Sequence, residues 1–250
     1  GKTEDAARFA AQARSYRNLW NPETRYFQGR NADGTFVGGF DPLLSADYYV
    51  EGNGWQYRFY APHDVPGLIE LFGGAGALTT ELETFFASGK DHPDTAMPDF
   101  YYWHGNEPDL HSAYVFALAG RPDKTQEWVR WVLAKKYRNT PDGLDGNDDG
   151  GTLSAWYLFS ALGLYAIPGK DLYVVGSPIL RRATLHLPGG DFVIAAPATS
   201  AENLYVQSAT LNGAPLTAPF LRHADLAGGG TLALEMGPAP SDWGRDASGP

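Results

Sequence analysis

The sequence contains no cysteine and only two methionines among its 250 residues. Disulfide bonds, thiolate metal sites and a cysteine nucleophile are therefore excluded. Basic residues are also scarce, since 19 Lys and Arg residues face 29 Asp and Glu residues and give a formal net charge of −10. This balance argues against nucleic acid and anionic membranes as partners. No apolar run reaches the roughly 18 residues of a membrane span, so a soluble chain is expected.

Aromatic residues are abundant, with 7 Trp, 14 Tyr and 13 Phe, and they suffice for a large buried core. Apolar residues recur at helical spacing, and the predicted helices cover residues 4–18, 65–72, 77–88, 109–118, 124–138 and 154–164. A hairpin is expected around the turn residues 31–34, and a polar loop over residues 89–97. After Pro168 short strands alternate with Gly, Pro and Asn-Gly turns; they cover residues 171–177, 183–187, 192–195, 205–211, 214–216, 220–221 and 231–236. The sequence therefore predicts a mostly helical part, residues 1–168, and a β-rich region, residues 169–250.

An acidic, glycine-rich stretch over residues 145–154 is the densest cluster of functional groups. It reads Asp-Gly-Asn-Asp-Asp-Gly-Gly-Thr-Leu-Ser, and a strongly apolar run follows it. Glycines let such a loop turn sharply and approach a ligand closely. Thr152 and Ser154 are expected to cap the following helix, with the acids beside its positive end. Simple helix capping is the alternative interpretation, and the density of acids favours a functional site.

A second stretch alternates acid and amide side chains with aromatic ones: Glu51, Asn53, Trp55, Gln56 and Tyr57. Aromatic faces beside amides and carboxylates suit a sugar, which has apolar C–H faces and a rim of hydroxyl groups. The alternative is a core helix in which the two aromatic side chains are only packed.

A third stretch brings aromatic residues next to His104, Asn106 and Glu107, just before the predicted helix over residues 109–118. Pro108 is tolerated in the first turn of a helix, so Asn106 and Glu107 should lie at its start. His104 and His111 flank this polar loop and are candidates for ligand contacts. Each could equally be a packing histidine.

These motifs occur together and in a fixed order. They include Glu51-Gly52-Asn53-Gly54-Trp55-Gln56-Tyr57, Pro62-His63-Asp64-Val65, His104-Gly105-Asn106-Glu107-Pro108, Gly146-Asn147-Asp148-Asp149-Gly150, Ser154-Ala155-Trp156-Tyr157 and Gly176-Ser177-Pro178. In this order and spacing they resemble the C-terminal half of glycoside hydrolase family 92, the calcium-dependent exo-α-mannosidases. The resemblance covers roughly residues 10–240.

The resemblance implies a fold and a reaction. The expected fold is part of an (α/α)6 helical barrel, over residues 1–168, followed by strands that form a small sheet or sandwich. The expected reaction is the removal of terminal α-linked mannose with inversion, from a glycan of the N-glycan or mannan type with an α-1,2 or similar linkage. Glu51 would be the general acid and Asp149 the general base, assisted by Asp148 or Asn147.

The resemblance also implies substrate and calcium contacts. The expected substrate-binding residues are Trp55, Gln56, His104, Glu107 and His111. Calcium prefers oxygen ligands from carboxylates, amides, carbonyls and water, and the oxygens on offer belong to Asn106, Glu107, Asn147 and Asp148. Zinc is disfavoured, because there is no cysteine and no His-Glu-x-x-His pattern.

The residue types suit inverting hydrolysis on chemical grounds. That reaction needs a protonated acid on one side of the anomeric carbon, and a carboxylate with a water on the other, about 6.5–9.5 Å away. Glu51 beside Trp55 and Tyr57 is expected to be partly buried, which would help it to keep its proton. Asp149 is expected to stay ionised if a cation lies nearby.

Two departures from the family pattern affect the expectations. Family members commonly carry two adjacent histidines where this chain has Leu110-His111, which puts linkage and sugar specificity in question. The chain also lacks the N-terminal sandwich and first barrel helices, and half a barrel would expose a large apolar surface. A tight partner bearing the missing N-terminal half is therefore expected. A secreted or periplasmic location is inferred from the substrate class and from calcium.

Two other functions fit the same residues less well. One is a helical-barrel enzyme that acts on glucosides or by phosphorolysis. Its activity would require free phosphate and would not change on chelation. The other is a non-catalytic carbohydrate-binding fragment, against which the intact Glu51 and Asp149 argue.

Overall fold

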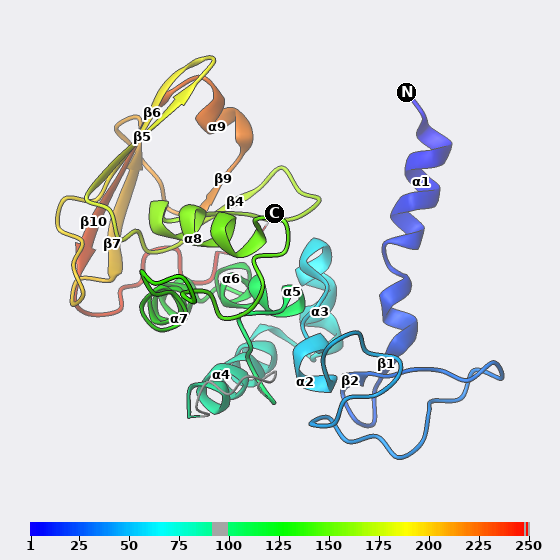
Figure 1. Cartoon of the computed structure of the whole chain (residues 1–250). Coiled ribbons are helices and arrows are strands. Elements are labelled where there is room, and N and C mark those ends of the chain that lie inside the picture. Colours follow the sequence, from blue (N-terminus) through cyan, green and yellow to red (C-terminus); the bar gives the residue numbers. More distant parts are fainter. Residues whose placement is uncertain (92–99, 248, 250) are drawn as a thin grey trace. The chain divides into compact units, whose positions relative to one another are not determined.

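A computed structural model describes residues 1–91, 100–247 and 249 of the chain. These residues form two compact units, residues 1–109 and residues 110–250, which are described separately (Figure 1). Within the described ranges, no helix is both long enough and apolar enough to cross a membrane. Most of the loop predicted over residues 89–97 falls outside these ranges, and its first residues belong to a helix.

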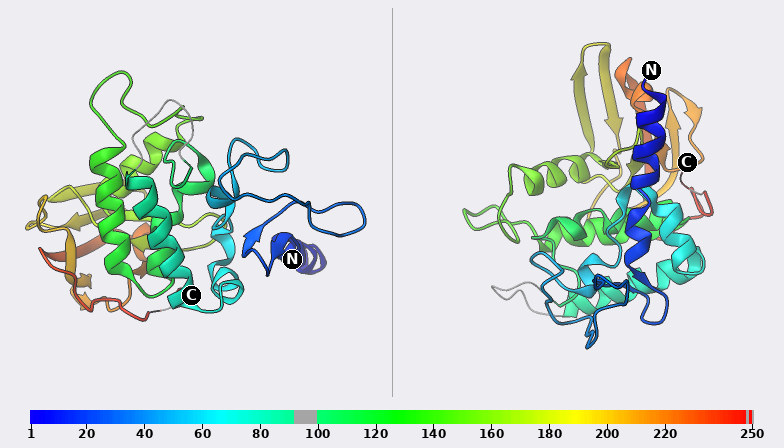
Figure 2. Two further views of the ribbon diagram at one scale, coloured as in Figure 1. Left: turned by 90° about the horizontal axis from the view of Figure 1, so that it is seen from below. Right: turned by 90° about the vertical axis from the view of Figure 1, so that its right-hand side faces the viewer.

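The first unit begins with helix α1 (Thr3–Gln12), which buries no side chain and projects from the rest of its unit (Figures 1 and 2). The helix predicted to run to residue 18 therefore ends early, and a 3-10 turn (Ser15–Leu19) follows. Here the Tyr16 hydroxyl donates a hydrogen bond to Asp64, at 2.8 Å. The paired strands are β1 (Trp20–Asn21) and β2 (Tyr26–Phe27). The hairpin predicted around residues 31–34 is reduced to a single bridge between Arg30 and Phe36.

Three helices complete the first unit: α2 (Gly54–Tyr57), α3 (Val65–Leu71) and α4 (Ala75–Asp91). Asp64 caps α3, because its carboxylate accepts the Gly67 amide hydrogen at 3.1 Å. The inward face of α4 carries Leu78, Leu82, Phe85 and Phe86, which recur at helical spacing and are fully buried.

An aromatic cluster forms the core of this unit. Phe85 contacts Phe59 and Tyr102, with ring centroids 5.3 and 5.7 Å apart, and Phe59 stacks on Phe72 at 5.6 Å. Burying one such ring contributes about 1.5–3 kcal/mol relative to leaving it in water. The cluster gives the loops above it a rigid base.

Residues 107–118 form two short helices, α5 (Glu107–Leu110) and α6 (Ser112–Leu118), where a single helix over 109–118 was predicted. The second unit continues with α7 (Pro122–Lys135) and α8 (Thr152–Leu162). Every residue of α6 is buried, and α6 packs along α7. On α7, Trp128, Val132 and Leu133 are buried, whereas Trp131 is only half-buried.

The strands of the second unit form two sheets. The strands of the larger sheet are β5 (Arg182–Leu187), β6 (Gly190–Ala195), β7 (Tyr205–Leu211), β8 (Ala214–Pro215) and β10 (Gly230–Gly237). They lie in the order β5-β6-β10-β7-β8, and all neighbouring pairs are antiparallel except β6–β10, which is parallel. The smaller sheet is antiparallel and contains β3 (Leu164–Ala166), β4 (Tyr173–Val175) and β9 (Phe220–Leu221). The predicted strands are all found, with small shifts of their ends, whereas β3 and the short helix α9 (His223–Ala227) were not predicted.

Helices give way to strands after residue 162, close to the change that the sequence indicates. Arg130 on α7 joins the two kinds of structure. Its guanidinium donates to the Pro178 carbonyl at 3.0 Å and to the Thr199 hydroxyl at 3.1 Å, and it also bonds the Ser200 carbonyl. The division of the chain into domains at residue 168 stays a prediction.

Candidate active site

The Glu51 turn of the first unit is held by the start of α2. Asn53 is the N-cap residue, and its side-chain oxygen accepts the amide hydrogens of Trp55 and Gln56, at 3.0 and 3.2 Å. The Gln56 side chain in turn accepts the Asn53 amide hydrogen at 3.2 Å, which completes a capping box. Such caps satisfy the amides that a helix start leaves open. Glu51 itself has a φ of +53°, a backbone conformation that residues other than glycine rarely adopt.

Side-chain amides connect this turn to the third predicted stretch. Asn53 Nδ2 donates to the Phe100 carbonyl at 3.0 Å, and Gln56 Nε2 donates to the Tyr101 carbonyl at 3.3 Å. Asn106 Nδ2 donates to the main-chain carbonyl of Glu51 at 2.8 Å. The structure therefore brings together two stretches that lie about fifty positions apart in the chain.

Trp55 and Gln56 are largely engaged within the protein. The Trp55 indole is 9% exposed, stacks on Phe85 with centroids 6.3 Å apart, and lies 4.9 Å from the Arg58 guanidinium. Gln56 is fully buried. Trp55 is therefore packed into the protein, and substrate contacts by Trp55 and Gln56 stay predictions.

The expected partial burial of Glu51 is wrong, because its side chain is exposed. Trp55 turns into the aromatic core, and Tyr57 stacks on Tyr49 at 5.2 Å, so neither ring covers the carboxylate. The Tyr57 hydroxyl donates to the Val50 carbonyl at 2.8 Å. Burial, and to a smaller extent the charges of Glu107 and Glu51, raise the pKa of Tyr57.

Buried side chains support the loop that carries His104 and Asn106. His104 is fully buried, and its Nδ1 lies 2.6 Å from the Tyr102 hydroxyl. Asp109, also fully buried, accepts the Trp103 amide hydrogen at 2.8 Å. At the tip Asn106 is 3% exposed, whereas Glu107 is exposed. This loop therefore presents one carboxylate outward on a rigid base.

His111 belongs to the second unit, at the N-cap position of α6, and it is 3% exposed. Its role as a substrate contact stays a prediction. The remaining predicted residues of this unit, Asn147, Asp148 and Asp149, all lie in the acidic loop before α8.

Asp148 holds the start of α8. Its carbonyl oxygen accepts the amide hydrogens of Thr152 at 2.7 Å and Leu153 at 3.4 Å. Its carboxylate accepts the amide and the hydroxyl hydrogen of Ser154, both at 2.8 Å. These bonds from Ser154 keep the pKa of Asp148 below its usual value. One residue thus satisfies the first three amides of the helix, which would otherwise need other partners.

The predicted caps Thr152 and Ser154 are therefore wrong: Gly151 is the N-cap residue, and Ser154 donates to Asp148 instead of accepting. The chain reaches the helix through three consecutive left-handed residues, Asp149, Gly150 and Gly151, with φ of +48°, +69° and +94°. Gly150 and Gly151 adopt such φ values easily, while Asp149 does so at a cost. The turn leaves Asp149 exposed, and Asn147 is exposed as well.

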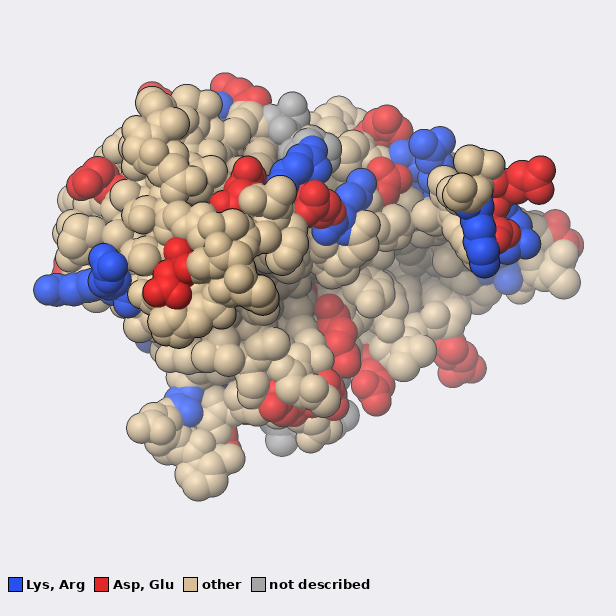
Figure 3. All heavy atoms as spheres, turned by 90° about the horizontal axis from the view of Figure 1, so that it is seen from above, with Lys and Arg blue, Asp and Glu red and all other residues tan. Residues whose placement is uncertain are grey.

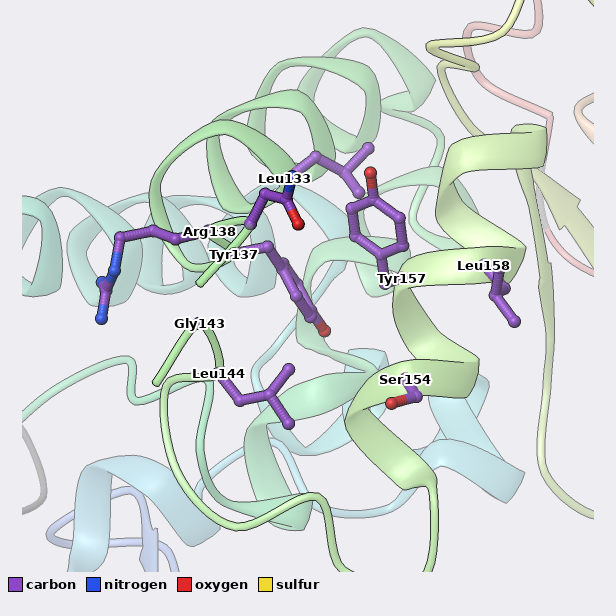
Figure 4. A pocket seen from close by; sticks show the side chains of 9 residues that line it. Leu133, Tyr137, Arg138, Gly143, Leu144, Ser154, Tyr157 and Leu158 are labelled. Atoms are coloured by element: carbon purple, nitrogen blue, oxygen red, sulfur yellow. The ribbon is translucent and has the colours of Figure 1, made fainter. Parts of the chain in front are cut away.

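A pocket of about 480 Å³ adjoins the acidic loop in the second unit, between the end of α7 and α8. Figure 4 shows Tyr137, Leu144 and Tyr157 around this hollow, with Ser154 on α8 at its edge. The Tyr137 and Tyr157 rings are 5.0 Å apart and tilted. Aromatic and aliphatic walls of this kind are typical of surfaces that receive either a sugar or another protein segment.

Charged side chains do not gather into one large patch on the face seen in Figure 3, where acidic and basic residues are scattered among uncharged ones. Among residues 1–91, 100–247 and 249, no group of three or more His, Asp or Glu side chains is placed to hold a metal ion. The predicted calcium ligands instead combine amide and carboxylate oxygens. Asn106 donates its Nδ2 hydrogen to the main-chain carbonyl of Glu51, so Oδ1 is the amide oxygen that could bind an ion. This all-oxygen donor set fits calcium in its chemistry.

Several structural roles at the site were not predicted from the sequence. The capping pair Asn53 and Gln56 has a readable signal, because Asn three residues before Gln at a helix start is typical of a capping box. Asp109 has no such signal, because the local sequence does not distinguish a carboxylate that points into the protein from one that lies at the exposed start of a helix. The same holds for an ion pair between Lys136 and Asp145, which are nine positions apart.

Comparison with known proteins places the chain in a family. Residues 1–238 match the glycosyl hydrolase family 92 catalytic domain. A relative from Arthroderma benhamiae, named an uncharacterized secreted glycosidase, is 29% identical over 240 residues, which cover 88% of this chain and 29% of the relative.

Two solved structures from Bacteroides thetaiotaomicron are similar over nearly the whole chain. A family 92 α-mannosidase in complex with mannoimidazole is 33% identical, with a TM-score of 0.88, and the match covers 97% of this chain and 34% of that one. A family 92 inverting mannosidase is 34% identical, with a TM-score of 0.88 and coverage of 98% and 35%. The chain thus spans about a third of the length of the proteins it matches.

Proposed function

Because the chain belongs to glycoside hydrolase family 92, we propose that it acts as an exo-α-mannosidase that releases terminal α-linked mannose with inversion. The observation that carries the proposal is the match over 97–98% of the chain to solved α-mannosidases of this family, one bound to mannoimidazole and one described as inverting. We further propose a substrate of the N-glycan or mannan type with an α-1,2 or similar linkage. A fold built as part of an (α/α)6 barrel belongs to the same proposal.

In this proposal Glu51 is the general acid and Asp149 the general base. Glu51 gives its proton to the glycosidic oxygen as the bond from that oxygen to the anomeric carbon breaks. Asp149 takes a proton from a water molecule, whose oxygen attacks the anomeric carbon from the opposite face and inverts it. Both carboxylates are exposed, and both sit on left-handed backbone, which supports their placement at a site under functional constraint.

Asp148 has a different part in this proposal. Its carboxylate accepts two hydrogen bonds from Ser154, so it supports the loop beside Asp149 and does not itself act on water. That division of labour between adjacent acids follows from their hydrogen bonds.

Calcium would supply electrostatic binding of sugar hydroxyls when bound. Asn106, Glu107 and Asn147 would hold it through their side-chain oxygens, and His104, His111, Trp55 and Gln56 would contribute to substrate binding. Of the proposed ligands, Glu107 and Asn147 are exposed, whereas Asn106 is 3% exposed.

We also propose that another part of a family 92 polypeptide, the N-terminal half, covers α8. Leu158 is 63% exposed, Phe159 39% and Tyr157 36%, and together they give this helix an apolar outer face beside the pocket. Apolar patches of this kind mark interfaces. A single monodisperse 27.1 kDa species in solution, fully active by itself, would contradict this part of the proposal. A secreted or periplasmic location is proposed from the substrate and from the name of the relative in Arthroderma benhamiae.

The test is mannose release from a panel of α-mannobiosides, before and after chelation and after return of calcium. We expect activity that chelation removes and calcium restores, with the β-anomer of mannose formed first, as detected by NMR. First formation of the α-anomer would contradict inversion. A requirement for free phosphate, with no effect of chelation, would favour a phosphorylase instead.

A further inference from the structure

A buried ion pair adjoins the acidic loop and has no part in the mechanism above. Lys136 follows the last residue of α7, and its Nζ lies 3.4 and 3.5 Å from the two carboxylate oxygens of Asp145. The Lys136 side chain is 5% exposed and that of Asp145 is 10% exposed. Taking two charges out of water costs free energy, so such a pair is weak evidence of stabilisation alone. A role in fixing geometry is the better-supported explanation for keeping it.

Asp145 is the first acid of the loop, and Asp148 anchors the far end to α8. The loop is therefore fixed at both ends by carboxylates: Asp145 ties it to the end of α7, and Asp148 ties it to the start of α8. Tyr137, the neighbour of Lys136, adds a hydrogen bond from its hydroxyl to the Leu153 carbonyl, at 2.9 Å. Asp149 follows directly after the second anchor.

We propose that the Lys136–Asp145 ion pair positions the acidic loop so that Asp149 is held where it acts as the base. The inference rests on the proposed function of Asp149. In this proposal Lys136 acts through Asp145, so it is a positioning residue. Its side chain is 5% exposed, and Nζ lies 5.8 Å from the centre of the Trp131 ring. A displacement of about 1 Å in a catalytic group can cost about a hundredfold in rate.

The test compares Lys136→Met and Asp145→Asn with the matched control Lys135→Met, all in the full chain. Lys135 is the adjacent lysine on the same helix end, but it is exposed. Two quantities are measured: hydrogen exchange of the amides of residues 146–151, and the kcat and KM for an α-mannobioside. Asp145→Asn is the milder change and keeps the test informative if Lys136→Met fails to fold.

We expect both site variants to speed amide exchange in the loop at least tenfold, and to lower kcat at least tenfold with KM within about twofold. The effects of the two changes on kcat should not add in the double variant, because both break the same pair. The control should match the wild type in each quantity. A purely structural role would slow turnover only in proportion to the unfolded fraction, which exchange in α6 reports.

Three outcomes would overturn the inference. Unchanged loop exchange in both variants would show that the pair does not hold the loop. Faster exchange with unchanged kcat, in an enzyme that Asp149→Asn inactivates, would show that the hold does not matter for the base. Full turnover by Asp149→Asn would overturn the assignment of the base, and the positioning role would fall with it.

Discussion

The side-chain nitrogen of Asn106 lies 2.8 Å from the main-chain carbonyl oxygen of Glu51. Asn106 is 3% exposed and Glu51 is exposed, so this bond is partly buried. It ties the turn that carries the proposed acid to the loop that carries the proposed calcium ligands. A change in either segment should therefore be felt in the other.

The Asn106–Glu51 bond can be broken without removing a calcium ligand. Asn106→Asp keeps side-chain oxygens but replaces the donor with an oxygen that faces the Glu51 carbonyl. Because a partly buried carbonyl then lacks its partner, we expect the free energy of unfolding to fall by about 0.5–1.5 kcal/mol, measured by urea denaturation. Asn139→Asp, at an exposed position, is the control. Equal stability of the two variants would contradict the importance of the bond.

Loss of the proposed acid should affect chemistry far more than folding. For Glu51→Gln we expect kcat to fall by about 10²–10⁴-fold, the range typical of one general acid, with little change in thermal stability because the side chain is exposed. Glu23→Gln, an exposed acid of the same unit, is the matched control. Steady-state kinetics on an α-mannobioside gives the measurement, and undiminished turnover of Glu51→Gln would assign the acid to another residue.

The backbone at Glu51 should carry strain that glycine would relieve. A left-handed backbone conformation costs a residue with a Cβ about 1–2 kcal/mol. Glycine removes this strain, but it also raises the conformational entropy of the unfolded chain, which offsets part of the stabilisation. We therefore expect Glu51→Gly to raise the free energy of unfolding by up to about 1 kcal/mol while it abolishes turnover. Asn212→Gly is the comparison, because Asn212 has a similar φ of +51° but Asn tolerates this region, so its gain should be smaller. A larger gain at position 212 than at 51 would contradict the argument.

Asp64 should make stability depend on pH in a defined direction. Partial burial alone raises the pKa of Asp64, but hydrogen bonds from the Tyr16 hydroxyl and the Gly67 amide, with the Arg17 guanidinium, bring the pKa below its usual 3.8. A carboxylate whose pKa is depressed on folding stabilises the protein above its unfolded-state pKa. That contribution is lost as the pH falls through the depressed folded-state pKa.

We therefore expect Asp64→Asn to destabilise the chain at pH 7, and the difference from wild type to shrink as the pH falls below about 4. Thermal unfolding between pH 7 and pH 3 provides the measurement. Asp47→Asn, at an exposed acid, should show no such trend. A difference that grows towards low pH would reverse the assigned sign.

Local sequence signals predicted local structure well. Asn212 and Gly213 form the turn between β7 and β8, because only a few residue types adopt the left-handed values that this turn needs. The buried face of α4 followed from helical spacing alone. The motifs also indicated the family, since several weak patterns in a fixed order are jointly specific.

Contacts between distant segments could not be read from such signals. Thr152 and Ser154 looked like caps by residue type, but Asp148 reaches forward and takes that role. Glu51 looked buried because aromatic residues follow it, yet the helix turns Trp55 inward and leaves the carboxylate outside. Side-chain direction depends on backbone conformation and on neighbours, neither of which spacing specifies.

The hydrogen bonds of Asp148 fix the number of residues between it and α8. An inserted residue would separate its carbonyl and carboxylate from the amides of Thr152, Leu153 and Ser154, and the helix would lose its first three partners at once. We therefore expect length variation to be tolerated better before Asp145, in the exposed segment around residues 138–142, than between Asp148 and α8. Insertions meant to reshape the surroundings of Asp149 should therefore be placed in that segment, with the acidic loop kept at its present length.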